Sequence, residues 1–388
     1  MDMSAINPYL TQVPVAFSSN VSASIWAYYD TAATAVLPNG FNRTLFSPPW
    51  QASVTDTDLY NANAYFNNTD FVAFAPTFLD LIGPNAKIDH IWDASSNTSH
   101  EASCFVPELN SLFFASWGFN HDFQYLLHAE TGELRNITTS PPITNAHGCV
   151  YYNGHLYVAT DGGAGTYASV YKVDPMTLNA TAILNNFYQQ PFLGFNDLDI
   201  DPNGNIWLTD SISAWVNYMT TFAPQTTTAV YFLNTTTLTP KWVFEAPGGW
   251  NSNVNGIAFA GDGTLYVDTT AISSSRPKGK YPLRTRALWA FDTRGGKPQL
   301  RDRRLFHNSI SYYCDGVRVS KHGYVFCATG DGVDVIEPEN GYTLGRIRVG
   351  RSGGLAVNVA FEDHVLWIVG RGGVWKVSGM KEQLKRDW

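Results

Sequence analysis

Six polar side chains recur at the same place in six similar segments of the chain, and all are of kinds that bind metal ions or carry protons. Each opens a segment in which an alternating apolar stretch, a tight turn and a second apolar stretch follow. These opening residues are Glu101, His147, Asn196, Asn255, Asp315 and Asn358. They comprise two carboxylic acids, three amides and one imidazole. A fold that brings them together forms a cage made mainly of oxygen donors.

The oxygen donors of this set predict a hard divalent cation. Calcium accepts carboxylate and amide oxygens in flexible geometry, whereas magnesium requires a near-ideal octahedron. Two carboxylates balance a charge of 2+, and zinc favours cysteines or several histidines over the single imidazole of this set. The set therefore favours Ca2+, with Mg2+ and Mn2+ as alternatives. Taken singly, each residue also has a structural interpretation, because a polar residue can cap the start of a strand.

The spacing of the six segments predicts how these residues are held. Their openings lie between 43 and 60 residues apart. The turns Asn153-Gly154, Asn203-Gly204 and Asp262-Gly263 are strong hairpin signals, because glycine adopts the positive φ that such turns require. Units of this length built from hairpins are typical of propeller blades, whose innermost strands begin near one mouth of a central channel. The sequence thus predicts an all-β fold, a six-bladed β-propeller with the opening residues at one mouth.

One domain accounts for most of the chain. We expect the propeller over residues 71–388, and an N-terminal extension packed on it over residues 1–70, where the repeat is absent. Helical patterns are confined to FLDLIG at 78–83 and to the tail SGMKEQLKRDW at 378–388.

The composition excludes several classes of protein. Aromatic residues make up 14% of the 388 residues and charged residues 15%, so a large core is expected and intrinsic disorder is excluded. The net charge of −8 argues against a nucleic-acid partner. No apolar run approaches the roughly 18 residues of a membrane-spanning helix, so no membrane partner is expected. A small-molecule substrate is the expected partner, and the sequence does not predict the oligomeric state.

Two features bear on the compartment and point in different directions. Seven Asn-x-Ser/Thr sequons favour a secreted glycoprotein, and they are Asn20, Asn42, Asn67, Asn97, Asn136, Asn179 and Asn234. The first residues, MDMSAINPYL, do not form a signal peptide, so a cytoplasmic protein with asparagine-rich loops is the alternative. Four cysteines form no disulfide framework or zinc motif, and their pairing is left open by the sequence.

Four stretches resemble the senescence-marker-protein, gluconolactonase and regucalcin-like family of calcium-dependent lactonases, most closely its fungal lactonohydrolase branch. They are HEASCF (100–105), LNNFYQQPFLGFNDLDIDPNGNIWLTDS (184–211), NVNGIAFAGDGTLYVDTT (253–270) and CDGVRVSKHGYVFCATGDGVDVIEPENG (314–341). The resemblance covers about residues 70–378 and implies a six-bladed propeller. The calcium ligands that it implies are Glu101, Asn196, Asn255 and Asp315. The chain departs from the family at His147, where asparagine is expected, and at Val254 and Cys314, where proline is expected.

The resemblance also implies roles in lactone hydrolysis. Calcium would act as a Lewis acid on the carbonyl and would hold a water molecule. Glu101 or Asp315 is the expected general base, and His147 is the alternative base, an oxyanion donor or a structural histidine. Asp197 is expected either to orient a ligand or water or to brace its strand. Asn358 is expected to contact substrate or to cap its strand, with the cap favoured.

Aromatic side chains precede several openings and bear on the substrate. They are Phe192, Phe195, Trp250, Tyr312 and Tyr313. If they line the mouth, they favour a bulky or aromatic lactone over a sugar lactone. The alternative is that they belong to the core.

Two other functions remain open at this point. A non-hydrolytic, metal-dependent cyclase, isomerase or dehydratase acting on an intermediate of secondary metabolism is suggested by His147 and by the aromatic residues near the mouth. The second alternative is a non-catalytic propeller that binds a ligand or a protein, because proteins with this architecture have many different functions.

Overall fold

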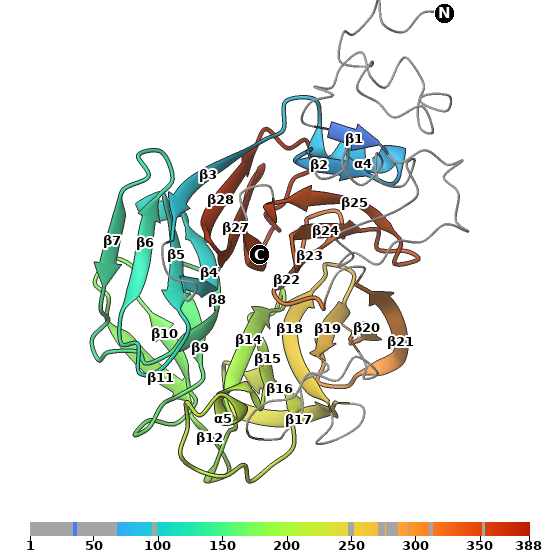
Figure 1. Ribbon diagram of the computed structural model, residues 1–388. Helices are drawn as coiled ribbons and strands as arrows, with labels where there is room; N and C mark the ends of the chain where they lie inside the picture. Colours follow the sequence, from blue (N-terminus) through green and yellow to red (C-terminus); the bar gives the residue numbers. More distant parts are fainter. Residues whose placement is uncertain are drawn as a thin grey trace, which may run out of the picture.

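The computed structural model describes residues 34–36, 68–94, 99–246, 252–270, 276, 286–293, 295–309, 313–350 and 354–388. Six antiparallel sheets are arranged around a central channel, as Figure 1 shows. In each sheet the strand nearest the channel pairs with the next strand along the chain, so hairpin follows hairpin outwards. The predicted six-bladed β-propeller is confirmed.

The first three blades follow each other directly along the chain. Blade one contains β4 (Ser99–Val106), β5 (Ser111–Ser116), β6 (Gln124–His128) and β7 (Leu134–Ile137). Blade two contains β8 (Ala146–Tyr152), β9 (His155–Thr160), β10 (Val170–Val173) and β11 (Ala180–Leu184). Blade three contains β14 (Phe195–Ile200), β15 (Ile206–Asp210), β16 (Ala229–Asn234) and β17 (Thr239–Glu245).

The last three blades complete the circle. Blade four contains β18 (Asn253–Phe259), β19 (Thr264–Thr270), β20 (Ala287–Asp292) and β21 (Arg301–Asn308). Blade five contains β22 (Val317–Val319), β23 (Val325–Thr329), β24 (Gly332–Ile336) and β25 (Thr343–Arg348). Blade six contains β26 (Leu355–Glu362), β27 (Val365–Arg371), β28 (Gly373–Ser378) and, from the N-terminal part of the chain, β3 (Lys87–Asp93).

The N-terminal part of the chain closes and extends the propeller. Strand β3 pairs with β28, with Ile88 opposite Val377, so both ends of the chain build blade six. Strand β2 (Phe71–Ala73) pairs with β25, and β1 (Thr34–Val36) pairs in parallel with β2 at the edge of blade five. The boundary at residue 70 stays a prediction, because residues 1–33 and 37–67 lie outside the described part.

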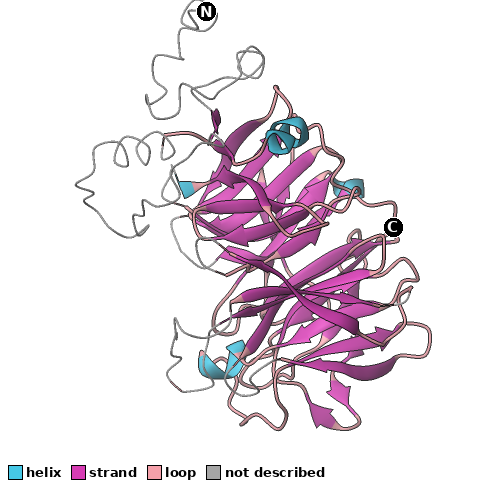
Figure 2. Cartoon of the chain, turned by 90° about the vertical axis from the view of Figure 1, so that its right-hand side faces the viewer, coloured by secondary structure: helices cyan, strands magenta, loops and turns pink. Residues whose placement is uncertain are grey.

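Short helices and one small hairpin complete the described elements. They are α4 (Pro76–Ile82), η3 (Pro107–Leu109), α5 (Ser213–Val216) and the pair β12 (Asn186–Phe187) and β13 (Gln190–Pro191). Figure 2 shows how small the helical share is beside the strands. Helix α4 confirms the helix expected around 78–83. None of the described helices has the length and apolar character needed to cross a membrane.

The helix expected in the tail at 378–388 is wrong. Beyond β28 this segment forms bends and extended chain. Contacts outweigh its local helical propensity: the Leu384 side chain is fully buried, and the Arg386 guanidinium donates to both oxygens of Asp199 at 2.7 Å. The Trp388 indole donates to the carbonyl of Ile200 at 2.9 Å. The tail is therefore anchored at the C-terminal ends of the innermost strands, opposite the opening residues.

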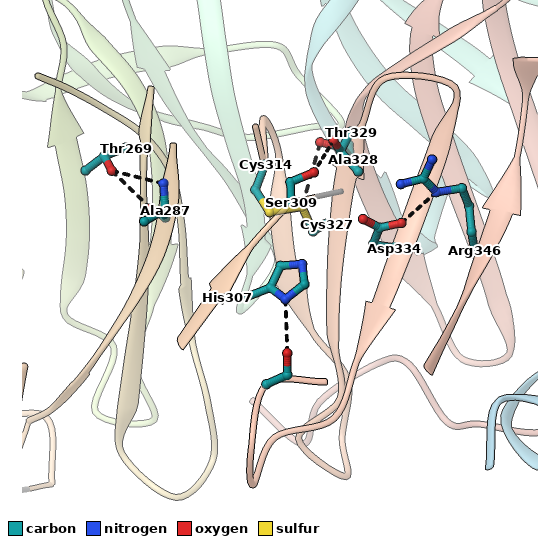
Figure 3. The surroundings of a disulfide bond; sticks show 11 residues. Thr269, Ala287, His307, Ser309, Cys314, Cys327, Ala328, Thr329, Asp334 and Arg346 are labelled. Carbon is teal, nitrogen blue, oxygen red and sulfur yellow. Dashed lines mark hydrogen bonds and ion pairs between the residues drawn. A yellow bond between two sulfur atoms is a disulfide. The ribbon is translucent and has the colours of Figure 1, made fainter. Parts of the chain in front are cut away.

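Two disulfides stabilise the innermost strands. Cys104–Cys149 joins β4 to β8 and so links blades one and two. Cys314–Cys327 ties the residue before Asp315 to β23 within blade five (Figure 3). Apolar side chains fill the space between neighbouring blades, including the fully buried rings of Trp207 and Trp367.

Candidate functional site

The innermost strands bring the opening residues together at one end of the channel. β4, β8, β14, β18, β22 and β26 each contact the next, and β26 contacts β4, so the circle is closed. We call the end where these strands begin the opening end, and the end where the C-terminal tail docks the tail end. Among the opening residues, the side chains of Glu101, His147, Asn196, Asn255 and Asn358 are buried, and that of Asp315 is half-buried.

Local irregularities in the strand pairing determine the direction in which the side chains of the opening residues point. The pairing register shifts at Glu101, between Ala146 and Gly148, between Phe195 and Leu198, between Val254 and Ile257, and between Ala356 and Asn358. A β-bulge turns a side chain away from the regular alternation and is common beside active sites. The bulges therefore direct the opening residues toward the channel, while the strands beyond them keep their alternating core pattern.

The glycine that follows three of the openings makes room for the next blade. A Cβ on Gly148 would lie 2.7 Å from Cα of Asp197, and one on Gly316 would lie 2.5 Å from Oδ1 of Asn358. A Cβ on Gly256 would clash with the carbonyl of Asp315. Only glycine permits this close approach, which sets each opening residue beside the next one.

Glu101, His147 and Asn196 form one side of the site. Oε1 of Glu101 lies 3.2 Å from Nδ1 of His100 and 3.5 Å from Nε2 of His147. The Asn196 amide nitrogen lies 3.0 Å from the same Nε2. Burial raises the pKa of Glu101, but His147 and His100 outweigh that effect and lower it to about 2. Glu101 is thus held as a carboxylate.

A buried aspartate orients His147. Oδ2 of Asp161 lies 2.6 Å from Nδ1 of His147 and accepts a hydrogen bond of 3.0 Å from the indole of Trp117. Burial opposes a charge on the imidazole, yet Asp161 and Glu101 raise the pKa of His147 well above its usual value. His147 is therefore fixed at both ring nitrogens.

Asn255 and Asp315 form the other side of the site. The Asn255 amide donates to the Asp315 carboxylate. Burial and the nearby charge of Glu101 raise the pKa of Asp315 to about 7. Within the part of the chain that the structure describes, neither Glu101 nor Asp315 forms an ion pair with a lysine or arginine.

Asp268 and Tyr313 lie close to Asp315. Burial and the charge of Asp315 raise the pKa of Asp268 well above the usual value. Burial and the charges of Asp315, Asp268 and Glu101 raise the pKa of Tyr313 in the same way. Acidic groups thus gather at the opening end.

Asp197 and Asn358 have structural partners. Asp197 accepts two hydrogen bonds from Arg318, of 2.8 and 3.1 Å, and its backbone nitrogen donates to the Thr209 hydroxyl at 3.1 Å. Oδ1 of Asn358 accepts from the Ser103 hydroxyl at 3.2 Å and from the nitrogen of Val359 at 2.8 Å. These contacts favour a brace for Asp197 and a cap for Asn358 over direct catalytic roles.

The aromatic residues expected at the mouth divide into three groups. Phe192 and Phe195 are buried in the core of blades two and three, with ring centroids 4.5 Å apart, so the core alternative fits them. Tyr313 lies at the site. Trp250 and Tyr312 lie outside the described residues. Trp117, which the sequence analysis missed, is half-buried, and its ring lies 6.0 Å from that of His147.

The donors at the opening end determine whether a metal ion can bind there. In the described ranges, no group of three or more His, Cys, Asp or Glu side chains is placed to hold one. A cation at the opening end therefore requires amide oxygens, which Asn196 and Asn255 supply. Two carboxylates, the buried Glu101 and the half-buried Asp315, have no lysine or arginine partner in the described chain and complete the set, so these residues fit a divalent cation.

Asp161 was not predicted from the sequence either, although a signal for it exists. Asp161 directly follows β9, the second strand of its blade, while Asp210 ends β15 and Asp268 lies near the end of β19. All three carboxylates are fully buried. A recurring aspartate at the end of the second strand thus marks a second layer of polar residues near the opening end.

Comparison with known proteins identifies relatives of this architecture. A family model described as the SMP-30/Gluconolactonase/LRE-like region matches residues 119–368. Lactonohydrolase oryL of Aspergillus oryzae is 32% identical over 338 residues, 81% of this chain and 76% of that protein. Lactonohydrolase oryH of the same organism is 24% identical over 408 residues, covering 83% of this chain and 84% of that protein.

Solved structures show the same fold. A gluconolactonase from Xanthomonas campestris superposes with a TM-score of 0.63 at 21% identity, covering 79% of this chain and 93% of that one. The calcium-binding protein regucalcin from Agrobacterium tumefaciens superposes with a TM-score of 0.55 at 15% identity, covering 76% and 95%.

Proposed function

The chain belongs to the SMP-30/gluconolactonase/LRE-like family, and we propose that it is a lactonase that hydrolyses its substrate at the opening end of the channel. Membership of this family supports a hydrolase of lactones in general. The observation that carries the proposal for this site is the pair of carboxylates, Glu101 and Asp315, brought together without an arginine or lysine partner in the described chain. Such a pair suits a bound cation.

We propose that Glu101, Asn196, Asn255 and Asp315 hold a divalent cation. Taken alone, these four oxygen donors favour calcium. When bound, such an ion polarises the lactone carbonyl and lowers the pKa of a water molecule. The β-bulges and the glycines that follow His147, Asn255 and Asp315 hold these donor side chains in place.

Asp315 is the side chain best placed to take a proton from water. Glu101 is buried and is occupied by the two histidine nitrogens, whereas Asp315 is half-buried and retains access to the channel. A general base must reach the proton that it removes, so access decides between these two carboxylates. His147 is held by Asp161, Glu101 and Asn196, which fits it for positioning other groups.

Two half-buried aromatic side chains support a bulky or aromatic lactone as the substrate. Trp117 lies beside His100 and His147, with ring centroids 6.3 and 6.0 Å away, and Tyr313 lies beside Asp315. Flat apolar surfaces of this kind bind ring systems better than polyhydroxylated sugars.

We also propose that the protein is a secreted glycoprotein. Disulfides persist in oxidising compartments, and the structure contains two of them. The sequon residues Asn136 and Asn179 are exposed and accessible to glycosylation. Treatment of the protein from its native source with an endoglycosidase should reduce its apparent mass, and an unchanged mass would refute the glycoprotein proposal.

A non-hydrolytic reaction at the same site is the second candidate. The observation that favours it is the His147–Asp161 pair, which adds a proton-carrying group beside the carboxylates. Conversion of a substrate to a product of equal mass, with no lactone opened, would support this candidate.

The proposed function is tested with a panel of aliphatic, sugar and aromatic lactones. Acid release is measured with protein as purified, after chelation, and after Ca2+, Mn2+ or Zn2+ is restored. We expect hydrolysis that disappears with the metal and returns with it, and an aromatic lactone as the preferred substrate. Intact lactones across the whole panel would refute lactone hydrolysis.

A further inference from the structure

His147 presents a ring nitrogen to the place where the proposed cation binds. A carboxylate can only accept a hydrogen bond when ionised, so the 2.6 Å contact with Asp161 places a hydrogen on Nδ1. Nε2 is the remaining nitrogen of the ring, and it faces Glu101 and Asn196, two of the proposed ligands. A metal-binding histidine almost always donates its other ring N–H to a carboxylate, a backbone carbonyl or water, and Asp161 is the carboxylate in that position for His147.

The distances between these atoms suit ligands of one ion. Bonds of about 2.1 Å at octahedral or tetrahedral angles place neighbouring ligand atoms about 3.0 to 3.4 Å apart. Nε2 of His147 lies 3.0 Å from the Asn196 amide and 3.5 Å from Oε1 of Glu101. A half-turn of the Asn196 amide places its oxygen where the nitrogen now lies, because the two ends of an amide have the same shape.

The surroundings of Asp161 also support the orientation of the His147 ring. Its side chain is fully buried, and its other oxygen, Oδ1, has no hydrogen-bond partner among the described residues. Trp117 and His147 both bind Oδ2, so that oxygen is fixed from two directions. A buried carboxylate committed to one imidazole nitrogen keeps the ring plane and the direction of Nε2 constant.

We infer that Nε2 of His147 is a ligand of the cation, that Asp161 positions it, and that this nitrogen shifts the preference of the site from Ca2+ toward Zn2+ or Mn2+. Calcium binds oxygen almost exclusively, whereas imidazole nitrogen suits zinc and other transition metals, and manganese accepts mixed nitrogen and oxygen sets. The inference rests on the proposed metal site. It adds a ligand and a preference that the four oxygen donors alone do not predict.

The ion preference can be measured without any substrate. Protein stripped of metal by chelation is titrated separately with Zn2+ and with Ca2+, and the affinity for each ion is obtained by competition with a chromophoric chelator. We expect the wild type to bind Zn2+ more tightly than Ca2+. His147→Asn should weaken Zn2+ binding by at least about 100-fold and change Ca2+ binding by less than about threefold, because an amide restores an oxygen donor.

Asp161→Asn tests the positioning role. It should weaken Zn2+ binding by about 10- to 100-fold, as removal of a carboxylate behind a metal-binding histidine does elsewhere, and should leave Ca2+ binding almost unchanged. His155→Asn is the matched control, since His155 lies in the same hairpin with Nδ1 facing the Asn153 carbonyl, at the far end from the site. It should leave both affinities unchanged. Should Asp161→Asn fail to fold, His147→Asn decides the question alone.

Electron spin-echo spectroscopy of Mn2+-loaded protein provides a direct second readout. The wild type should show coupling of the ion to an imidazole nitrogen, and His147→Asn should lose it. Nitrogen coupling that persists in His147→Asn, or equal losses of Zn2+ and Ca2+ affinity in that variant, would overturn the inference. Equal losses would mean that His147 only supports the fold or acts as a base. These results do not depend on lactone hydrolysis, so failure of the proposed function and failure of this inference are distinguishable.

Discussion

Strand β14 carries polar side chains to two different settings within one channel. At its start Asn196 meets His147 at the opening end, where Glu101 and Asp315 lie together. Further along, Asp197 and Asp199 point toward the tail end and bind Arg318 and Arg386. A cavity of about 380 Å³ at the tail end is lined by both arginines and by Trp388 of the tail.

The two ends differ in how their carboxylates are neutralised. At the tail end Asp197 and Asp199 each have an arginine with two-point contact, so their charges are balanced within the protein. At the opening end the described residues supply no such partner to Asp315, and burial together with Glu101 raises its pKa to about 7. The two ends therefore have different roles. Carboxylates that are paired with arginines stabilise the fold, whereas carboxylates that have no such partner are available to a ligand.

The largest effect is expected from breaking a pair at the tail end. Arg318→Met leaves Asp197 buried without its partner and should lower the free energy of unfolding by about 3 to 5 kcal/mol. The double variant Arg318→Met with Asp197→Leu should recover much of that loss, because no uncompensated charge remains. Urea denaturation followed by tryptophan fluorescence measures both. A single variant as stable as the wild type would remove the structural role assigned to this pair.

The opposite response is expected at the opening end. Asp315→Asn keeps a hydrogen-bonding side chain but removes the repulsion from Glu101, so the metal-free protein should unfold with an unchanged or higher free energy. The value of kcat/KM for lactone hydrolysis should fall by about 100- to 1,000-fold, equivalent to about 3 to 4 kcal/mol. Denaturation and steady-state kinetics on the same preparation test this. A variant that loses stability and keeps its activity would reverse the assignment of the two ends.

A smaller effect is expected from the tail itself. Arg386→Ala removes charged hydrogen bonds to Asp199 and should lower the free energy of unfolding by about 1.5 to 3 kcal/mol near neutral pH. Burial raises the pKa of Asp199, but Arg386 outweighs that effect and lowers the pKa below its usual value. Because this pKa is lowered in the folded state, the ionised Asp199 carboxylate stabilises the fold at pH values above its unfolded-state pKa. That stabilisation is lost as the pH falls through the folded-state pKa.

The difference in the free energy of unfolding between the wild type and Arg386→Ala should therefore be constant at neutral pH and should shrink below about pH 4. Denaturation curves measured from pH 3 to pH 7 show this. The kinetics of lactone hydrolysis should not change, because the tail lies at the opposite end of the channel. A difference that grows toward low pH would contradict the role given to this pair.

The sequence predicted the blades because their signals are local. Alternating strands and the turns at Asn153-Gly154, Asn203-Gly204 and Asp262-Gly263 determine hairpins whatever surrounds them. The same repeats placed Glu101, His147, Asn196, Asn255 and Asp315 at one end, and the structure brings them there. Their roles as metal ligands stay predictions.

What the sequence could not predict depends on contacts between distant residues. Asp161 acquires its importance only when the blade folds it against His147, and the tail abandons a helical pattern because Asp199 and Ile200 provide partners. Phe192 and Phe195 looked like mouth residues by position, yet the packing of neighbouring blades buries them. Local pattern carries little information about such contacts.

We propose that Glu101 and Asp315 at the opening end lack a lysine or arginine partner in the described chain because they bind a cation. The most direct test is calorimetric titration of metal-stripped wild type, Asp315→Asn and Asp302→Asn with Ca2+, Mn2+ and Zn2+; Asp302 is an exposed carboxylate on β21 and serves as the control. We expect one ion per chain in the wild type and the control, and none at the same concentrations in Asp315→Asn. Equal binding by all three proteins, or no binding by the wild type, would contradict it.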